Sequence, residues 1–315
     1  MKQAKFKDKL KYYEQKYFTH DLPIPFKGDL VIYPVMVPDY YKFYACIECF
    51  KLNKNLDIEG VPMSHLKYLF YRMQKDEHGG TLLFQFIQLL ELIFHIKNGI
   101  RCPKCKEFYS YEQVSRDLDK LEKKMKDENI TDTESQNQIL GQYYTQLRHC
   151  EKCNCQKEDV IRYTDTKEKI ALFINDVEIS PKEYEELKSI VLYWNIPDWD
   201  DDYINPDLKK ELDEVARLKN PNMVQPSLEK QECCIVASSS YTFETVKQLT
   251  IRKLVLLLRT VDTKLHYVAY RQGEMSGLVR FKGEIDHWIY SDDHKDKFKD
   301  IMTMDQLKNK LKDVT

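Results

Sequence analysis

The spacing of apolar and polar positions along the chain predicts a protein that is mostly helical, with a few short strands. Residues 2–18 place apolar side chains at helical intervals among lysines, which is typical of an amphipathic helix. Pro23 and Pro25 then break this pattern, and residues 30–37 alternate in the manner of a strand. Residues 39–52 return to helical spacing, and we expect the aspartate at their start to cap a single helix.

The most apolar segment of the chain is residues 82–97, where apolar side chains occur almost all round a helical projection. Such a helix is expected to be buried between other helices, and Asn98-Gly99 is a typical end for it. His95 lies inside this segment, and we expect it to be a core histidine with satisfied hydrogen bonds. Ser64 and Thr81 are candidate caps for the helices that follow them.

Two further helical patterns lie between residues 100 and 165, with a polar stretch between them. The first has apolar positions at Val114, Leu118, Leu121 and Met125, and the second at Ile139, Leu140, Tyr143, Tyr144 and Leu147. This arrangement predicts an antiparallel helical hairpin, whose base brings the two flanking segments together.

The last part of the chain alternates strand and helix patterns. Residues 169–180 predict a β-hairpin that turns at Asn175-Asp176, and Ser180 then opens a capping box with proline at the first helical position. A long helix is predicted over residues 242–271, ended by Gly273 and Gly277. The other expected segments are an acidic loop (196–207), a helix from Asn205-Pro206, a polar linker (220–226), a second hairpin or a strand and turn (279–290), and a basic final helix (303–312).

Composition and charge exclude several classes of protein. The 315 residues carry 51 acidic and 49 basic side chains, and a net charge of −2 argues against a global polyanion binder. With 42% hydrophobic and 12% aromatic residues the chain should fold. No window approaches the roughly 18 apolar residues of a membrane helix. The first fifteen residues contain no apolar core of a secretory signal, so we expect a soluble protein that stays in the cytosol.

Nine cysteines in a cytosolic chain indicate thiols or metal ligands rather than disulfides. Two Cys-x-x-Cys pairs, Cys102 with Cys105 and Cys150 with Cys153, are separated by 44 residues. Zinc prefers four thiolates in a tetrahedron, so the two pairs predict a closed structural zinc site without an open position for water. Redox-active thiol pairs and unligated cysteines are the alternatives.

Other cysteines leave the ligand set open. Cys155 lies two residues after the second pair and His149 directly before it, and either could replace one of the four ligands. Cys46 and Cys49 form a third Cys-x-x-Cys pair, but they fall within a helical pattern and are expected to be small core side chains. Cys233-Cys234 lies in an apolar run and is also expected to pack in the core.

With this site included, the pattern predicts a mainly α fold of the α+β class. We expect a helical body with small β-hairpins and an inserted zinc-ribbon-like module that carries the helical hairpin. Three domains are predicted: an α-rich domain over residues 1–99, the zinc-knuckle module over residues 100–165, and an α+β domain over residues 166–315. No repeat of fixed period occurs, which excludes solenoid architectures.

The remaining motifs do not assemble a catalytic site. The acidic loop contains Asp198, Asp200, Asp201 and Asp202, with Asp207 beyond them, but its spacing is not that of a calcium-binding EF-hand. We interpret it as a solvated face or a docking surface for a basic partner. The eight histidines form no metal-binding pair, and the P-loop, dinucleotide-binding and nucleophile-elbow motifs are absent. We therefore assign no catalytic residue and no organic cofactor.

Charge also varies along the chain. Residues 1–99 carry 14 basic and 11 acidic side chains, a net charge of +3, and residues 166–315 carry 23 and 27, a net charge of −4. The zinc-knuckle module has 12 basic and 13 acidic side chains, so its net charge is −1. That module lacks the basic stripe of a phosphate binder. A basic N-terminal part and an acidic C-terminal part suit head-to-tail contact with proteins better than binding to nucleic acid.

Three segments resemble late-gene tail proteins of tailed phages of low-GC Gram-positive bacteria. They are the run LVIYPVMVPDYYKFYACIECFKLNKN (residues 30–55), the run VPMSHLKYLFYRM (residues 61–73) with the apolar helix after it, and residues 240–277. The resemblance lies in composition and phrase-like segments over most of the chain. It implies a structural or assembly component of the tail or baseplate, similar to T-even baseplate hub assembly proteins, with no catalytic residues to carry over. The zinc-knuckle insertion departs from the simpler members of this group.

From these observations we expect a non-enzymatic phage tail or baseplate protein that acts through protein–protein contacts. Its expected partners are other tail or baseplate proteins or a second copy of the chain, and its expected location is the virion tail or the host cytoplasm during assembly. The alternative is a zinc-ribbon regulator that binds nucleic acid through Lys104, Lys106, Arg148 and Lys152 around the knuckles. Thiol redox chemistry at Cys102 and Cys105 is the third hypothesis.

Overall fold

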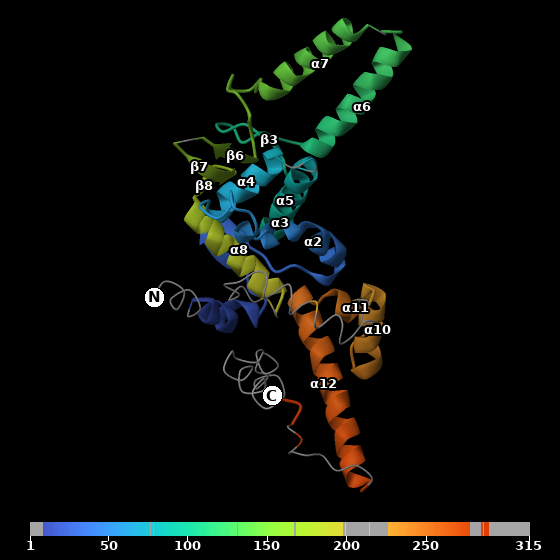
Figure 1. Cartoon of the computed structure of the whole chain (residues 1–315). Helices are drawn as coiled ribbons and strands as arrows, with labels where there is room; N and C mark the ends of the chain where they lie inside the picture. Colours follow the sequence, from blue (N-terminus) through green and yellow to red (C-terminus); the bar gives the residue numbers. More distant parts are fainter. Residues whose placement is uncertain are drawn as a thin grey trace, which may run out of the picture. The chain divides into compact units, whose positions relative to one another are not determined.

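Helices dominate the architecture of the chain, and small antiparallel sheets complete it (Figure 1). The computed structural model describes residues 9–75, 77, 79–130, 132–166, 168–197, 199, 214, 226–277, 285 and 287–289. Two compact units are present: the first comprises Met1–Gln225 with Thr250–Arg252, and the second comprises Pro226–Leu249 with Lys253–Thr315. The predicted mainly α fold with small β-hairpins is therefore confirmed.

The core of the first unit is a group of helices packed through aromatic side chains. Phe50 has no exposed surface, and its ring centroid lies 6.2 Å from that of Phe86 and 5.6 Å from that of Tyr184. Phe18 stacks on Trp194 at 5.3 Å. The α-helices are α2 (Tyr40–Cys46), α3 (Glu48–Lys51), α4 (His65–Lys75), α5 (Gly79–Phe94) and α8 (Pro181–Asn195). A π-helix, η1 (Glu14–Phe18), and two 3-10 helices, η2 (Val37–Asp39) and η3 (Lys54–Leu56), accompany them.

Three small sheets accompany these helices. Strands β1 (Ile24–Lys27) and β2 (Leu30–Ile32) form a hairpin. A second sheet has the order β4-β3-β5, from strands β3 (Gly99–Arg101), β4 (Phe108–Ser110) and β5 (Glu158–Asp159). A third has the order β6-β7-β8, from strands β6 (Ile161–Asp165), β7 (Ile170–Ile174) and β8 (Val177–Ile179). All pairs are antiparallel.

Several local predictions are confirmed. The chain turns between β7 and β8 at Asn175-Asp176, where Asn175 has a φ of 53°. The hydroxyl of Ser180 accepts the N–H of Glu183, and the Glu183 carboxylate accepts the N–H of Ser180 at 2.8 Å, which is the predicted capping box of α8. Ser64 caps α4 by accepting the N–H of Lys67 at 3.2 Å.

The helical hairpin consists of α6 (Tyr111–Asp127) and α7 (Thr133–Arg148), joined at the end remote from the β4-β3-β5 sheet (Figure 1). Ser110 and Asp132 cap the two helices through their side-chain oxygens. Helix α7 begins within the stretch that we expected to be a polar connection, because Asp132 provides a good cap there. Only Val114 and Met125 are buried among the side chains of both helices. The hairpin thus has little core of its own.

Three sequence predictions near the N-terminus are wrong. The strand over residues 30–37 ends at Ile32, because Tyr33 instead donates its N–H to Ile93 and Pro34 has no N–H to continue the ladder. The expected break of the helical pattern at Pro23 and Pro25 is not among them, because the last helical residue is Phe18 and Pro25 lies in β1. The single helix over residues 39–52 is two helices that meet at Ile47, and the Asp39 side chain makes no capping hydrogen bond.

Two later helices also differ from their predictions. Helix α5 begins at Gly79, ahead of the expected cap Thr81. The long helix over residues 242–271 is divided into α11 (Phe243–Lys247) and α12 (Ile251–Met275). Thr250 between them is buried, pairs with Met36 across a β-bridge and bonds the carboxylate of Asp21 at 3.1 Å. These distant partners outweigh the local preference for a continuous helix.

The second unit contains α10 (Leu228–Ser238), α11 and most of α12. Thr242 and Thr245 form a capping box at the start of α11. Gly273 lies within α12, and Gly277 follows the end of the helix with a φ of 71°. Most of the acidic loop, nearly all of the helix from Asn205-Pro206, of the polar linker and of the second hairpin, and the whole final helix lie outside the described residues.

Candidate metal centre

The structure brings the four cysteines of the two predicted pairs together. The sulfurs of Cys102, Cys105, Cys150 and Cys153 all lie within 4.8 Å of one another. Cys102 and Cys153 approach to 3.2 Å, and Cys105 and Cys150 approach to 3.3 Å. A tetrahedral zinc with Zn–S bonds of about 2.3 Å separates its sulfurs by about 3.8 Å, so the observed spacings bracket that value. This cluster can hold a metal ion.

Both cysteine pairs adopt the same backbone turn. In the first turn the carbonyl of Cys102 accepts the N–H of Lys106 at 3.0 Å, and its own N–H bonds the carbonyl of Glu107 at 2.8 Å. In the second the carbonyl of Cys150 accepts the N–H of Asn154 at 2.9 Å, and its own N–H bonds the carbonyl of Cys155, also at 2.9 Å. Each turn therefore points two sulfurs to the same side.

The residue after each pair has a left-handed backbone. Lys106 has a φ of 61° and Asn154 a φ of 56°. A lysine in this region carries a strain that glycine or asparagine largely avoids. Sequence reasoning missed these two positions, although an asparagine directly after a Cys-x-x-Cys pair is a usable signal for such a turn.

The turns hold their sulfurs close to strands and helix ends. The first turn connects β3 to β4, whose residues Arg101 and Phe108 pair directly beyond it. The second turn lies in a short hairpin in which Lys157 donates its N–H to the carbonyl of Arg148 at 2.7 Å. Gly99 in β3 is required by crowding, because a Cβ there would lie 2.4 Å from the carbonyl oxygen of Tyr109. The helical hairpin is thus inserted between two knuckles of a zinc-ribbon-like sheet.

Backbone N–H groups in the first turn favour a thiolate. The N–H of Cys105 lowers the pKa of the Cys102 thiol, burial raises it, and bonds from Cys153 and the N–H of Lys104 lower it further, to about 6. The hydrogen bond to Cys102 and burial raise the pKa of Cys153 to about 11, so one thiolate is stabilised at the expense of its neighbour. A metal cation would replace the shared protons and allow all four sulfurs to ionise.

Charged side chains around the cluster are largely paired. Glu107 lies 3.3 Å from the sulfur of Cys150 and forms ion pairs with Lys152 at 3.1 Å and Lys157 at 3.6 Å. The hydrogen bond from Lys152 lowers the pKa of Glu107, as does the bond from the Cys150 thiol. Lys106 pairs with Asp176 at 2.8 Å. These carboxylates form ion pairs with most of the cationic side chains around the two cysteine turns.

A carboxylate clamp closes the base of the helical hairpin. Asp159 in β5 binds the guanidinium of Arg148, at the end of α7, through two contacts of 3.0 Å and 3.1 Å. The hydroxyl of Tyr111, at the start of α6, donates to the same carboxylate. Sequence reasoning missed this clamp, because its three members are distant in sequence and carry no common motif.

The two alternative ligands, Cys155 and His149, lie outside the cluster of four sulfurs. Cys155 places its sulfur 3.5 Å from the carbonyl oxygen of Cys153 and is not part of the described cluster. His149 is exposed at the end of α7 and is also outside the cluster. Among the described residues, the four cysteines of the two pairs are the ones that the fold brings together.

Cys46 and Cys49 are buried in the helical body, as expected. The thiol of Cys49 donates to the carbonyl of Cys46 at 3.0 Å, and burial raises its pKa. The prediction for Cys233-Cys234 is wrong, because both side chains are exposed on α10. His95 is also not a core residue: it follows the end of α5 with a φ of 50°, is exposed, and stacks on Tyr33 with centroids 4.1 Å apart.

Comparisons with known proteins identify no relative of this chain. No protein-family model matches it, and no curated protein or solved structure is significantly similar. In the part of the chain that the structure describes, no helix combines the length and apolarity needed to cross a membrane. Of the aspartates in the predicted acidic loop, Asp198, Asp200, Asp201, Asp202 and Asp207 all lie outside the described residues.

Proposed function

We propose that the four cysteines bind one structural zinc ion. The observation that supports this most strongly is the pair of matching turns, which direct four sulfurs to one point with spacings close to those of a tetrahedral zinc site. Thiolate sulfur is a soft ligand, and four of them favour zinc or iron over magnesium, calcium or manganese. A full set of four ligands suits a structural role.

The role of the zinc is to fasten the helical hairpin to the protein. Helices α6 and α7 contain 17 and 16 residues, yet only two of their side chains are buried. A segment with so little apolar burial cannot offset its conformational entropy on its own. Structural zinc contributes about 10–16 kcal/mol to the folding of small modules, which is enough to order this one.

We further propose that the whole protein is a non-enzymatic assembly component of a phage tail or baseplate. The resemblance of residues 30–55, 61–73 and 240–277 to tail proteins supports this function. Exposed apolar side chains in the connection before α4 also support contact with other proteins: Leu56 is 67% exposed, Ile58 is 92% exposed and Val61 is 53% exposed.

The charge pattern favours this function over nucleic-acid binding. Of the four cations that a zinc-ribbon regulator would use, three form ion pairs with acidic side chains: Lys106 with Asp176, Arg148 with Asp159, and Lys152 with Glu107. Only Lys104 has no such contact among the described residues. Lys106, Arg148 and Lys152 could contact phosphates only if these ion pairs were broken.

Affinity purification from infected cells tests the assembly function. A tagged full-length chain is expected to retain tail or baseplate proteins, and the same chain with Ile58→Asp is the matched control for contacts through the exposed connection. Recovery of no tail or baseplate protein, together with salt-sensitive retention of DNA or RNA, would favour the nucleic-acid alternative and reject the proposal.

A further inference from the structure

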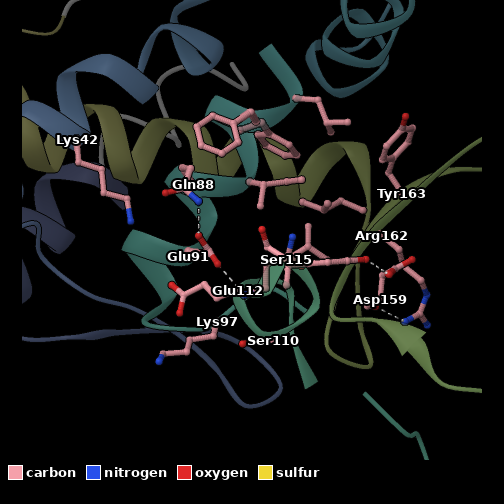
Figure 2. Close-up of a pocket in the computed structure, with 18 residues that line it drawn as sticks. Lys42, Gln88, Glu91, Lys97, Ser110, Glu112, Ser115, Asp159, Arg162 and Tyr163 are labelled. Carbon is pink, nitrogen blue, oxygen red and sulfur yellow. Dashed lines mark hydrogen bonds between the residues drawn. The ribbon is translucent and has the colours of Figure 1, made fainter. Parts of the chain in front are cut away.

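A cavity of about 780 Å³ lies in the first unit, beside the strands that carry the metal-binding turns (Figure 2). One side is formed by α5, and another by the start of α6 with Ser110 and Ser115. The third side is formed by Asp159 of β5 and by strands β6 and β7. The volume is within the range of binding clefts for ligands and partner segments.

The apolar wall of this cavity includes a large side chain in contact with water. Phe84 on α5 is 62% exposed, whereas Phe86 on the same helix is 1% exposed. Ile87, Ile161 and Leu172 continue the apolar surface. Because a well-exposed phenylalanine lines it, the cavity is an open groove rather than a closed chamber. Such a surface gains free energy when a partner covers it.

The charged side chains of the groove are unequally compensated. Asp159 is bound by Arg148, and Arg162 forms an ion pair with Glu158 at 2.9 Å. Glu112 lies 4.0 Å from Arg116. Because each of these charged side chains has an oppositely charged neighbour, together they contribute little net charge to the groove.

Three further charges remain. Lys42 and Lys97 line the groove, are exposed, and have no carboxylate partner among the described residues (Figure 2). Glu91 accepts hydrogen bonds from Gln88 at 2.7 Å and from the N–H of Asn98 at 2.7 Å, and no cation pairs with it in the described part of the chain. Two free cations therefore face one uncompensated carboxylate. The excess is positive, so an acidic group on the occupant would be favoured.

The groove has the dimensions of a short helix contact. Phe84, Ile87, Gln88 and Glu91 line it from one face of α5. From Phe84 to Glu91 the helix rises about 10 Å, which is about two turns. A partner helix that lies along this face would present apolar residues at three- and four-residue spacing to Phe84 and Ile87.

We propose that this groove docks a short amphipathic segment of a partner protein, with an apolar anchor over Phe84 and a carboxylate beside Lys42 and Lys97. This inference rests on the proposed function, because it names the chemistry of the partner that an assembly protein would bind. The first unit alone supplies every residue of the groove.

A random peptide library tests this proposal with the full-length, metal-loaded chain as bait. Displayed peptides of about 12 residues are long enough for about three helical turns. We expect enrichment of sequences that combine aromatic or aliphatic residues at helical spacing with Asp or Glu. Synthetic peptides of the enriched sequences are then measured by fluorescence anisotropy.

Variants connect the binding to the groove. Phe84→Ala is expected to weaken binding by about tenfold or more, and the double change Lys42→Glu with Lys97→Glu to weaken it by a similar factor. Phe243→Ala and Lys67→Glu remove an exposed phenylalanine and an exposed lysine elsewhere and should leave binding unchanged. Unchanged thermal melting of each variant shows that the fold is intact.

The proposal is overturned if no peptide is enriched, if the enriched peptides are basic, or if they bind the Phe84 variant as tightly as the natural chain. The assembly function has its own readout, which is recovery of tail proteins by the tagged chain. Should the tagged Phe84 variant still recover them while the peptide test fails, the function stands and the groove is not its docking site.

Discussion

Replacing one cysteine of the cluster should release the helical hairpin while the rest of the first unit stays folded. Cys150→Ser removes a proposed ligand whose side chain has no exposed surface. The two buried side chains of the hairpin, Val114 and Met125, stabilise it by about 1.5–3 kcal/mol each, or about 3–6 kcal/mol together. A structural zinc contributes about 10–16 kcal/mol. The proposed zinc would thus be the larger contribution, and α6 and α7 should lose stable structure without it.

Hydrogen–deuterium exchange resolved by peptide measures this effect. Amides in residues 111–148 of the Cys150→Ser variant should lose their protection by about two orders of magnitude or more, since a loss of even about 3 kcal/mol of local stability has that effect. Amides of α5 and α8 should keep most of theirs, because their aromatic core does not involve the hairpin. Cys155→Ser is the matched control, as its sulfur lies outside the cluster.

One result would refute this reasoning. If residues 111–148 are protected equally in the natural chain and in the Cys150→Ser variant, and metal analysis confirms that the variant is metal-free, the metal does not hold the hairpin. Equal loss of protection in the Cys155→Ser control would instead show that Cys155 belongs to the site.

Three further changes test other parts of the structure. Asp159→Ala removes the clamp on Arg148 and should lower the free energy of unfolding by about 1 kcal/mol in a urea titration, since the pair is partly exposed; no change would mean that the clamp is unimportant. Phe50→Ala should cost about 3–5 kcal/mol by calorimetry, and a cost under about 1 kcal/mol would contradict the central place given to this ring. For Glu183, burial raises the pKa, but the ion pair with Lys27 and the hydrogen bond from the N–H of Ser180 lower the pKa by more than burial raises it. The resulting pKa of Glu183 is about 2. The natural chain should therefore exceed the Glu183→Gln variant in stability by about 1 kcal/mol near neutral pH, an advantage lost as the pH falls from about 4.5 to about 2; a difference independent of pH would contradict this.

Local patterns in the sequence predicted those features that depend on neighbouring residues. The Cys-x-x-Cys spacing, the capping box at Ser180 and the turn at Asn175-Asp176 are each contained within a few residues. In the same way, helical periodicity indicated α6 and α7, although the start of α7 was placed too late. The ligand register between Cys153 and Cys155 was open, because only the folded turn shows which sulfur points inward.

Long-range contacts decided the features that the sequence could not show. The division between α11 and α12 depends on Thr250, whose hydroxyl bonds Asp21, 229 residues earlier in the chain. His95 itself has a left-handed backbone directly after the end of α5, which turns its side chain out of the core, whereas helical periodicity assigns it to the core when the helix is extended by one residue. The groove with Phe84 joins three elements that no single pattern connects.

Metal content of the purified chain tests the central claim most directly. Full-length protein purified without chelator and analysed by inductively coupled plasma mass spectrometry should contain one zinc ion per chain, and the quadruple variant with serine at positions 102, 105, 150 and 153 should contain none. Less than about half an equivalent of zinc in the natural chain, or iron in its place, would contradict the account.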